Sequence, residues 1–294
     1  MKKLTSALLL TAAGFTPASQ ASELTINGFL TVGASMLDEQ KASIAGADNN
    51  GGFKQDTVLG LQIQKQVNKS TIATGQLVSR GSDDYSTEAA WAFATYAATD
   101  DLDIRMGRLR IPFFYFSDFL EVGYAYNWVR PPGEVYRIPF SSIDGTDLNY
   151  RYSSGNLDGC VQIYYGRYQG PFTQDFGQGL GPETYTADFK NFTGIVLSNN
   201  LGNFGSRLSY HQAELNIATP AISTLGTIIT NAGNDFSFTG QTSRFLEAAL
   251  SYDDGDNTLI AEWTSLEHDN AAFLDDQAWM LSASKRFSDI TAHA

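Results

Sequence analysis

Opposite charges gather in the middle of the chain, between residues 105 and 145. Acidic and basic side chains that face each other across a narrow aqueous passage create a transverse field, which orders water and favours solutes able to align with it. Such a field selects small polar solutes without making or breaking bonds. The side chains that we predict to line a constriction of this kind are Arg108, Arg110, Asp118, Glu121, Arg130, Glu134, Arg137 and Asp144.

The segment 113–145 carries most of these charges, and its composition is unusual for an exposed loop. Residues 113–116 are a run of aromatic side chains, and prolines at 112, 131, 132 and 139 stiffen the segment. Exposed apolar patches of this density need a reason. We therefore expect the segment to fold back into the domain, and a surface cap with ordinary solvated charges is the alternative.

Three arginines lie on the predicted strand before this segment. Strict alternation puts Arg108 and Arg110 on one face of that strand and Arg105 on the other. A β-bulge near Gly107 would bring all three to the same side. Without such a bulge, Arg105 is the least secure member of the set.

Catalytic and metal-binding patterns are weak. His211 lies two residues from Ser209 on one predicted strand face, but a nucleophilic site also needs an orienting polar group. The H-E-x-x-H, G-x-S-x-G and phosphate-binding glycine motifs do not occur. The acidic turn at residues 253–256 lacks the remaining spacing of an EF-hand loop. We predict no enzyme and no cofactor or bound metal, and we interpret His211 as a polar residue facing a lumen.

The first 21 residues have the features of a secretory signal peptide. Lys2 and Lys3 precede an apolar stretch over residues 4–15, and Ser19 and Ala21 provide small side chains at a cleavage site. The stretch is too short for a membrane-spanning helix. The sequence therefore predicts an exported protein whose mature domain covers residues 22–294.

Bulk composition excludes several classes of protein. The net charge of −13 argues against nucleic acid as a partner, because phosphate backbones bind clustered lysine and arginine. Cys160 is the one cysteine, so a disulfide framework is excluded. After residue 21, no apolar run approaches the roughly 20 residues that a helical span requires. An exported protein built of strands fits all three observations.

Alternation with a period of two recurs along the chain in about a dozen segments, each roughly 9–13 residues long. Leu59, Leu61 and Ile63, for example, alternate with Gln62 and Gln64. The connections between these segments alternate in length along the chain. Long ones cover residues 38–56, 113–145, 169–188 and 218–241, and short ones cover 68–69, 100–101, 154–156 and 253–257.

This regular spacing is typical of an up-and-down barrel with short turns at one end and long loops at the other. A soluble Greek-key sandwich mixes its connection lengths. The sequence therefore predicts an all-β fold, a transmembrane up-and-down antiparallel β-barrel with about 12 strands in this chain. A secreted soluble β-sandwich that binds glycans through its aromatic residues is the alternative of another class.

Residues 107–113, Gly-Arg-Leu-Arg-Ile-Pro-Phe, lead into the third long connection, and at this point the chain resembles the general bacterial porin family. The resemblance implies a 16-stranded barrel in the outer membrane of a Gram-negative cell, an infolded third loop that narrows the pore, and a homotrimer. It implies outer-membrane lipid, lipopolysaccharide, small hydrophilic solutes and ions as partners. Against 16 strands the chain would be C-terminally incomplete, and a smaller closed barrel is the other possibility.

Two kinds of selectivity remain open for such a channel. A general diffusion porin needs only a charged, unspecific constriction, whereas a substrate-specific channel would carry a ladder of aromatic or arginine side chains. Arginines on the strands and on the third loop could form a ladder for anions, while the net charge of −13 favours cations. The expected function is passive diffusion of small hydrophilic solutes and ions through a water-filled pore.

Overall fold

The computed structural model describes residues 9–11, 24–38, 49, 51–175, 182–218, 239–269 and 275–294. Apart from residues 9–11, the predicted signal peptide lies outside them, and so does most of the predicted loop 218–241. The helices in the described ranges are two single 3-10 turns, η1 (Gly81–Asp83) and η2 (Ser117–Phe119). In those ranges no helix has the length and apolar character needed to cross a membrane.

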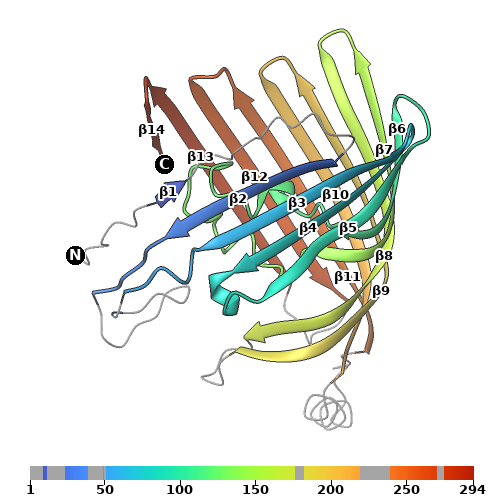
Figure 1. The fold of residues 1–294 in the computed structure, drawn as a ribbon, viewed down its shortest axis with the longest axis horizontal. Coiled ribbons are helices and arrows are strands. Elements are labelled where there is room, and N and C mark those ends of the chain that lie inside the picture. The colour runs from blue at the N-terminus through green and yellow to red at the C-terminus, as the bar shows by residue number, and fades with distance from the viewer. Residues whose placement is uncertain are drawn as a thin grey trace. The chain divides into compact units, whose positions relative to one another are not determined.

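Strands make up nearly all of the remaining regular structure (Figure 1). Twelve strands, β2 to β13, correspond to the alternating segments of the sequence, and each has at least nine residues. The strands are β1 (Leu9–Thr11), β2 (Leu24–Gly33), β3 (Val58–Asn68), β4 (Thr71–Arg80), β5 (Thr87–Ala97), β6 (Leu102–Arg110), β7 (Ser142–Ser154), β8 (Leu157–Asp175), β9 (Pro182–Leu201), β10 (Phe204–Ala218), β11 (Thr239–Asp253), β12 (Asn257–His268), β13 (Asp276–Phe287) and β14 (Ile290–His293).

The order of the strands in the sheet is their order in the sequence. From β6 to β14 every consecutive pair is antiparallel, and so are the pairs among β1 to β4. The predicted short links prove to be tight turns, such as those between β3 and β4 and between β11 and β12. This confirms the all-β, up-and-down antiparallel organisation.

Two predicted loops are shorter than the sequence suggested. β7 begins at Ser142, because residues 142–145 pair with residues 107–110 of β6, so the long connection covers residues 111–141. The predicted loop 169–188 is largely strand, because residues 169–175 of β8 pair with residues 182–188 of β9. In both places the backbone continues the ladder although the side chains no longer alternate cleanly.

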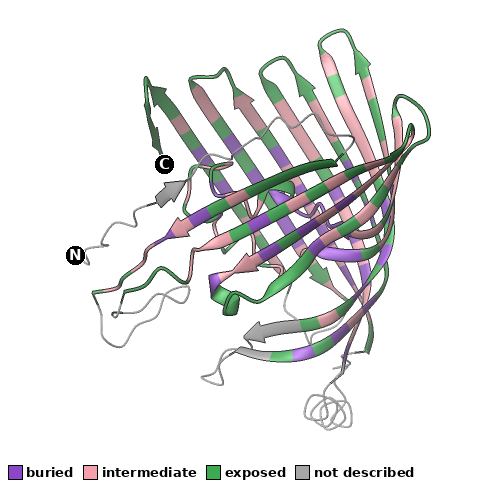
Figure 2. Ribbon diagram, viewed as in Figure 1, coloured by how far each residue is buried: buried purple, intermediate pink, exposed green. Residues whose placement is uncertain are grey.

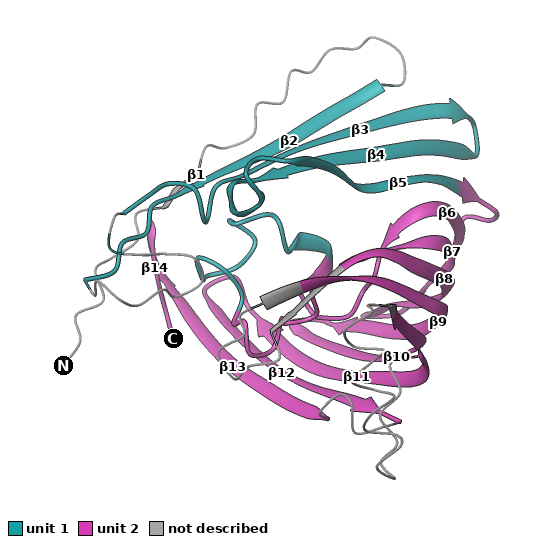
Figure 3. Ribbon diagram, turned by 90° about the horizontal axis from the view of Figure 1, so that it is seen from below, with its two compact units in different colours: residues 1–95, 118–131 teal, residues 96–117, 132–294 magenta. Residues whose placement is uncertain are grey.

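The chain divides into two compact units, coloured separately in Figure 3. Unit 1 comprises Met1–Thr95 and Asp118–Pro131, and unit 2 comprises Tyr96–Ser117 and Pro132–Ala294. The connection 111–141 therefore contributes its middle to unit 1 and both of its ends to unit 2. Each unit is described by itself.

One face of the sheet in unit 2 exposes large apolar side chains, unlike a soluble sheet (Figure 2). The other face, here called the loop face, packs against residues 111–117 and 132–140, and it buries apolar side chains such as Phe245 together with polar ones such as Ser209 and Glu247. The opposite face, here called the open face, presents large apolar side chains, with Leu250 66% and Trp279 73% exposed. A soluble sandwich buries its apolar face and hydrates its polar one. The open face therefore suits a hydrocarbon surrounding.

Candidate functional site

The two ends of the connection 111–141 lie buried against the loop face of unit 2. Phe113 is 3% exposed, and its ring centroid lies 5.2 Å from that of His211 on β10 and 5.4 Å from that of Phe245 on β11. Phe140, from the other end of the connection, stacks on Tyr168 of β8 at 4.5 Å. Aromatic contacts at these separations stabilise by about 0.5–1.5 kcal/mol each beyond the area they bury. They explain the dense aromatic composition that the sequence shows here.

Arg207 on β10 holds the start of this connection by its backbone. Its Nη1 lies 3.4 Å from the Phe113 carbonyl oxygen, and its Nη2 donates to the carbonyl oxygen of Pro112. The same guanidinium pairs with Glu247 of β11, whose other donor is the Ser209 hydroxyl at 3.0 Å. The side chains of Arg207 and Glu247 are 10% and 0% exposed. Removing one partner of so buried a pair leaves an uncompensated charge, which costs about 3–5 kcal/mol.

Glu262 on β12 joins the two ends of the connection. Its Oε1 accepts a hydrogen bond from the Tyr115 backbone N–H at 2.9 Å, and its Oε2 accepts one from the Tyr136 hydroxyl at 2.6 Å. The Tyr136 oxygen in turn accepts from the Phe116 N–H at 3.2 Å. Burial, reinforced by the Glu262 charge, raises the pKa of Tyr136 well above its ordinary value, so the phenol keeps its proton and stays a donor.

The middle of the connection is held within unit 1. Arg80 at the end of β4 binds Glu121 with Nε at 3.2 and 3.1 Å from the two carboxylate oxygens and Nη2 at 2.5 Å from one of them. Arg130 Nη2 lies 2.8 Å from Asp56 Oδ1. Burial, with the charges of Glu121 and Asp56, raises the pKa of Tyr126 to about 12. Gly123 packs against Thr31 of β2, where a Cβ would lie 2.9 Å from the threonine hydroxyl.

The predicted constriction residues of the connection therefore have different surroundings. Glu121 and Arg130 are paired in unit 1, whereas Arg137 pairs with Asp276 at the start of β13 in unit 2. Asp118 and Glu134 are exposed. Among them, Glu121, Arg130 and Arg137 form ion pairs with residues of other parts of their unit, which anchor the connection.

Arg108, Arg110 and Asp144 share one face of the β6–β7 pair. In the register Arg108 pairs with Asp144 and Arg110 with Ser142, on the strand face opposite to that of Arg105, and Arg110 is buried there, only 7% exposed. Gly107 has a φ of 135°, which favours glycine, but the register continues through it without a bulge. The bulge that would bring the three arginines together is therefore not present in this pair of strands.

Unlike Arg108 and Arg110, Arg105 of β6 lies on the loop face. Its Nε lies 2.9 Å from Asp147 Oδ1 and its Nη2 lies 2.5 Å from Asp147 Oδ2. Asp147, 1% exposed, also accepts hydrogen bonds from Asn149 and from Gln162, each at 2.8 Å. Strict alternation in the sequence already separates Arg105 from Arg108, and that signal was correct.

Ser209 and His211 are held apart by different partners. The Ser209 hydroxyl donates to Glu247, whereas His211 Nδ1 lies 2.6 Å from the Tyr164 hydroxyl. A Cβ at Gly194, between these two rings, would lie 2.7 Å from His211 Nδ1, so the close approach requires glycine. The side chains of Ser209 and His211 are each 1% exposed. In the described part of the chain, no cluster of three or more His, Cys, Asp and Glu side chains suits a metal ion.

Comparison with known proteins finds likeness at the level of fold. No protein-family model matches the sequence, and no curated protein does. Among solved structures, Salmonella typhi OmpF in complex with daunomycin matches with a TM-score of 0.54 and 17% identity, over 91% of this chain and 75% of that one. The outer membrane channel DcaP of Acinetobacter baumannii matches with a TM-score of 0.40 and 12% identity, over 96% and 92%. The chain has the antiparallel all-β fold of the outer-membrane porins.

Proposed function

We propose that this chain is a non-enzymatic porin of the outer membrane, which forms a water-filled channel for passive diffusion of small hydrophilic solutes and ions. The observation that supports this most strongly is the exposure of large apolar side chains on the open face of unit 2. A lipid surrounding requires an apolar outer face of this kind. The porin fold supports the same assignment.

In this proposal the connection 111–141 narrows the channel. Buried contacts on Arg207 and Glu262 fix its two ends in unit 2, and Arg80 and Asp56 fix its middle in unit 1. A segment held by ion pairs of this kind keeps a defined position, as a size filter requires. Swelling of protein-containing liposomes in sugars of increasing mass tests this function. We expect the rate of sugar entry to fall steeply as the mass of the sugar increases. Exclusion of the smallest sugar to the same extent as the largest would contradict the proposal.

We infer that the channel prefers cations. The arginines that could line an anion path are matched by carboxylates, since Arg80, Arg105 and Arg207 each pair with an acidic side chain. The chain as a whole has a net charge of −13. Reversal potentials across a planar bilayer with a salt gradient should therefore have the sign of cation selectivity. The opposite sign would favour the anion-selective alternative.

A charged side chain in the middle of the open face should prevent stable insertion. Ala248→Arg, on the open face and four residues from Tyr252, places a guanidinium in the apolar band, which costs about 2–4 kcal/mol near the bilayer centre. We expect a lower yield of folded protein in vesicles. The yield is measured on a gel by the difference in mobility between unheated samples, in which the β-sheet stays folded, and heated samples. Glu267→Arg, on the same face but near the long-loop end of β12, is the matched control and should insert normally. Equal insertion of the two variants would contradict a lipid-facing open face.

The processing and assembly of the protein are further parts of the proposal. The signal peptide would be removed after Ala21, which the mass of the mature N-terminal peptide would reveal. Three copies would associate in the membrane with outer-membrane lipid and lipopolysaccharide around them, as the resemblance to porins implies. Chemical crosslinking in native membranes should give a trimer as its largest product, and a monomer alone would contradict the homotrimer.

A further inference from the structure

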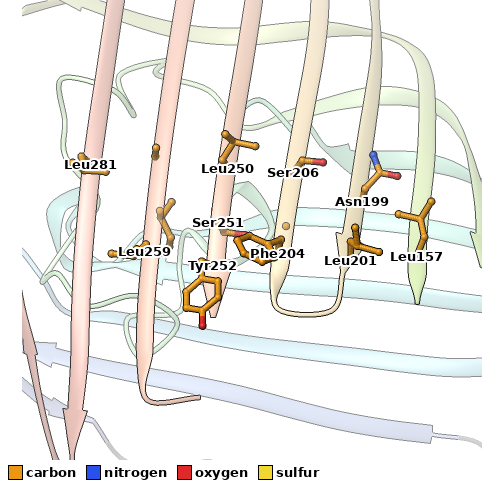
Figure 4. Close-up of a pocket in the computed structure, with 13 residues that line it drawn as sticks. Leu157, Asn199, Leu201, Phe204, Ser206, Leu250, Ser251, Tyr252, Leu259 and Leu281 are labelled. Atoms are coloured by element: carbon orange, nitrogen blue, oxygen red, sulfur yellow. The ribbon is translucent and has the colours of Figure 1, made fainter. Parts of the chain in front are cut away.

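A groove runs across the open face of unit 2, over β8 to β13 (Figure 4). It consists of two adjoining hollows of about 640 and 700 Å³. Leu250 and Leu281 line both hollows, together with the small side chains of Ser206 and Ala261. In Figure 4, Leu250, Leu259 and Leu281 lie on neighbouring strands, and Tyr252 lies closer to the turn end.

The shape and chemistry of the groove suit a hydrocarbon chain. Small residues, such as Ser206 and Ala261, alternate with large ones, of which Leu281 is 67% exposed and Trp279 73% exposed. From Leu259 to Trp263 the groove covers five residues of β12, and the four steps between them span about 13 Å at 3.3 Å per residue. That length matches one leaflet, since the whole hydrocarbon core is about 30 Å thick.

The turn end of the groove carries both signs of charge. Lys285 of β13 pairs in register with Asn257, and on the open face it is the diagonal neighbour of Leu259, which lines the groove. The acidic turn 253–256 lies beside it, because the Arg286 N–H donates to the Asp256 carbonyl oxygen at 2.7 Å. Hydrogen bonds from Asn257 and from the Asp256 N–H lower the pKa of Asp254 to about 2, so this turn is ionised at neutral pH.

Aromatic side chains mark the same level as a membrane boundary. The Lys285 ammonium lies 5.5 Å from the centroid of the Phe287 ring, and the Tyr252 hydroxyl donates to Asp254 at 3.1 Å. Amphipathic aromatic rings and lysines with apolar stems are typical of the headgroup level. The apolar groove therefore ends where a lipid headgroup would begin.

We propose that this groove binds one phospholipid with a zwitterionic primary-amine headgroup, a phosphatidylethanolamine, in the leaflet at the turn end. Its acyl chain lies in the groove, Lys285 binds the phosphate, and the acidic turn binds the ammonium. A purely anionic headgroup would be repelled by that turn, and a quaternary amine could not donate hydrogen bonds to its carboxylates. A second copy of the chain is a poorer occupant. A stable interface buries about 800 Å² per partner, and the surface of the second copy would have to protrude in order to fill this hollow.

Brominated lipids test this site, because bromine on an acyl chain quenches the fluorescence of tryptophan that it touches. Trp263 and Trp279 pair in register and line the groove. The full chain with Trp91→Phe and Trp128→Phe would be reconstituted into vesicles of phosphatidylethanolamine and phosphatidylglycerol, with one or the other brominated. Vesicles with brominated phosphatidylcholine complete the series. We expect quenching to report phosphatidylethanolamine enriched several-fold at the groove over either of the other two lipids, because only its ammonium can donate hydrogen bonds to the acidic turn.

The double variant Asp254→Asn with Asp256→Asn should abolish this preference, because the acidic turn is what distinguishes the three headgroups. Lys285→Gln removes a contact with a phosphate that all three lipids share, so it should weaken quenching by all of them and leave the order of preference unchanged. Equal quenching by all three headgroups, or a preference that survives the double variant, would overturn the proposal. No quenching by any brominated lipid would also overturn it and indicate that protein covers the groove. The site rests on the proposed membrane channel, so conductance is recorded from the same vesicles. Conductance without a headgroup preference rejects the lipid site alone, and absence of both rejects the channel.

Discussion

Arg207→Ala should lower the free energy of unfolding by about 3–5 kcal/mol. The substitution leaves Glu247 as a fully buried carboxylate without its counter-ion and frees the carbonyl groups of Pro112 and Phe113. The remaining Ser209 hydroxyl bond cannot offset a buried charge. Urea unfolding of the protein in lipid vesicles, followed by tryptophan fluorescence, would measure the change as a lower midpoint.

The matched control is Arg151→Ala, which removes an exposed ion pair at the turn end of β7, on the loop face. Arg151 Nη1 lies 2.5 Å from Asp103 Oδ2, but the arginine side chain is 50% exposed. Exposed pairs contribute little because water screens them. We expect almost no change in the midpoint.

The double variant Arg207→Ala with Glu247→Ala should recover part of the loss, since no lone charge remains buried. Equal effects of Arg207→Ala and Arg151→Ala would contradict the stabilising role of the buried Arg207–Glu247 pair.

Glu262→Ala should release the connection 111–141 from the loop face and open a wider channel. The carboxylate accepts from the Tyr115 N–H and from the Tyr136 hydroxyl, so one substitution removes a bond to each end of the connection. Hydrogen bonds to a charged group contribute about 1.5–3 kcal/mol each. Loss of even one should make displaced states at least about ten-fold more populated.

Single-channel recordings would show this as longer occupancy of a level with higher conductance. Tyr136→Phe removes one of the two bonds and should give an intermediate occupancy. Glu267→Ala changes a carboxylate of the same strand on the open face and should leave the levels as they are. If Glu262→Ala and Glu267→Ala had the same recordings, the connection would not limit the channel.

Strand positions were the part of the fold that the sequence could predict. Alternation such as that of Leu246, Ala248 and Leu250 with Glu247 reports which side chains share a face, and this is a local property. It also separated Arg105 from Arg108 correctly. The loop boundaries were less accurate, because residues 142–145 and 169–175 join the ladder through backbone hydrogen bonds, which side-chain patterns do not report.

The buried contacts that hold the connection 111–141 could not be predicted from the sequence for a different reason. Glu247 and Glu262 appear in the sequence as the polar positions of two strands, and nothing local distinguishes a carboxylate in water from one beneath a loop. Their roles depend on contacts across about 100 residues or more, from Tyr115 to Glu262 and from Phe113 to Arg207. Charge density alone directed attention to Arg108, Arg110 and Asp144, and the register of β6 and β7 places them on the strand face opposite to that of Arg105.

Single-channel recording of the purified full chain in a planar bilayer tests the channel assignment most directly. We expect discrete current steps that are linear in voltage and grow with salt concentration, because a water-filled passage conducts in proportion to its ions. Insertion is checked in parallel by flotation of the protein with lipid vesicles. Protein that floats with the vesicles and has the spectrum of β-sheet, yet gives no current steps, would contradict the assignment.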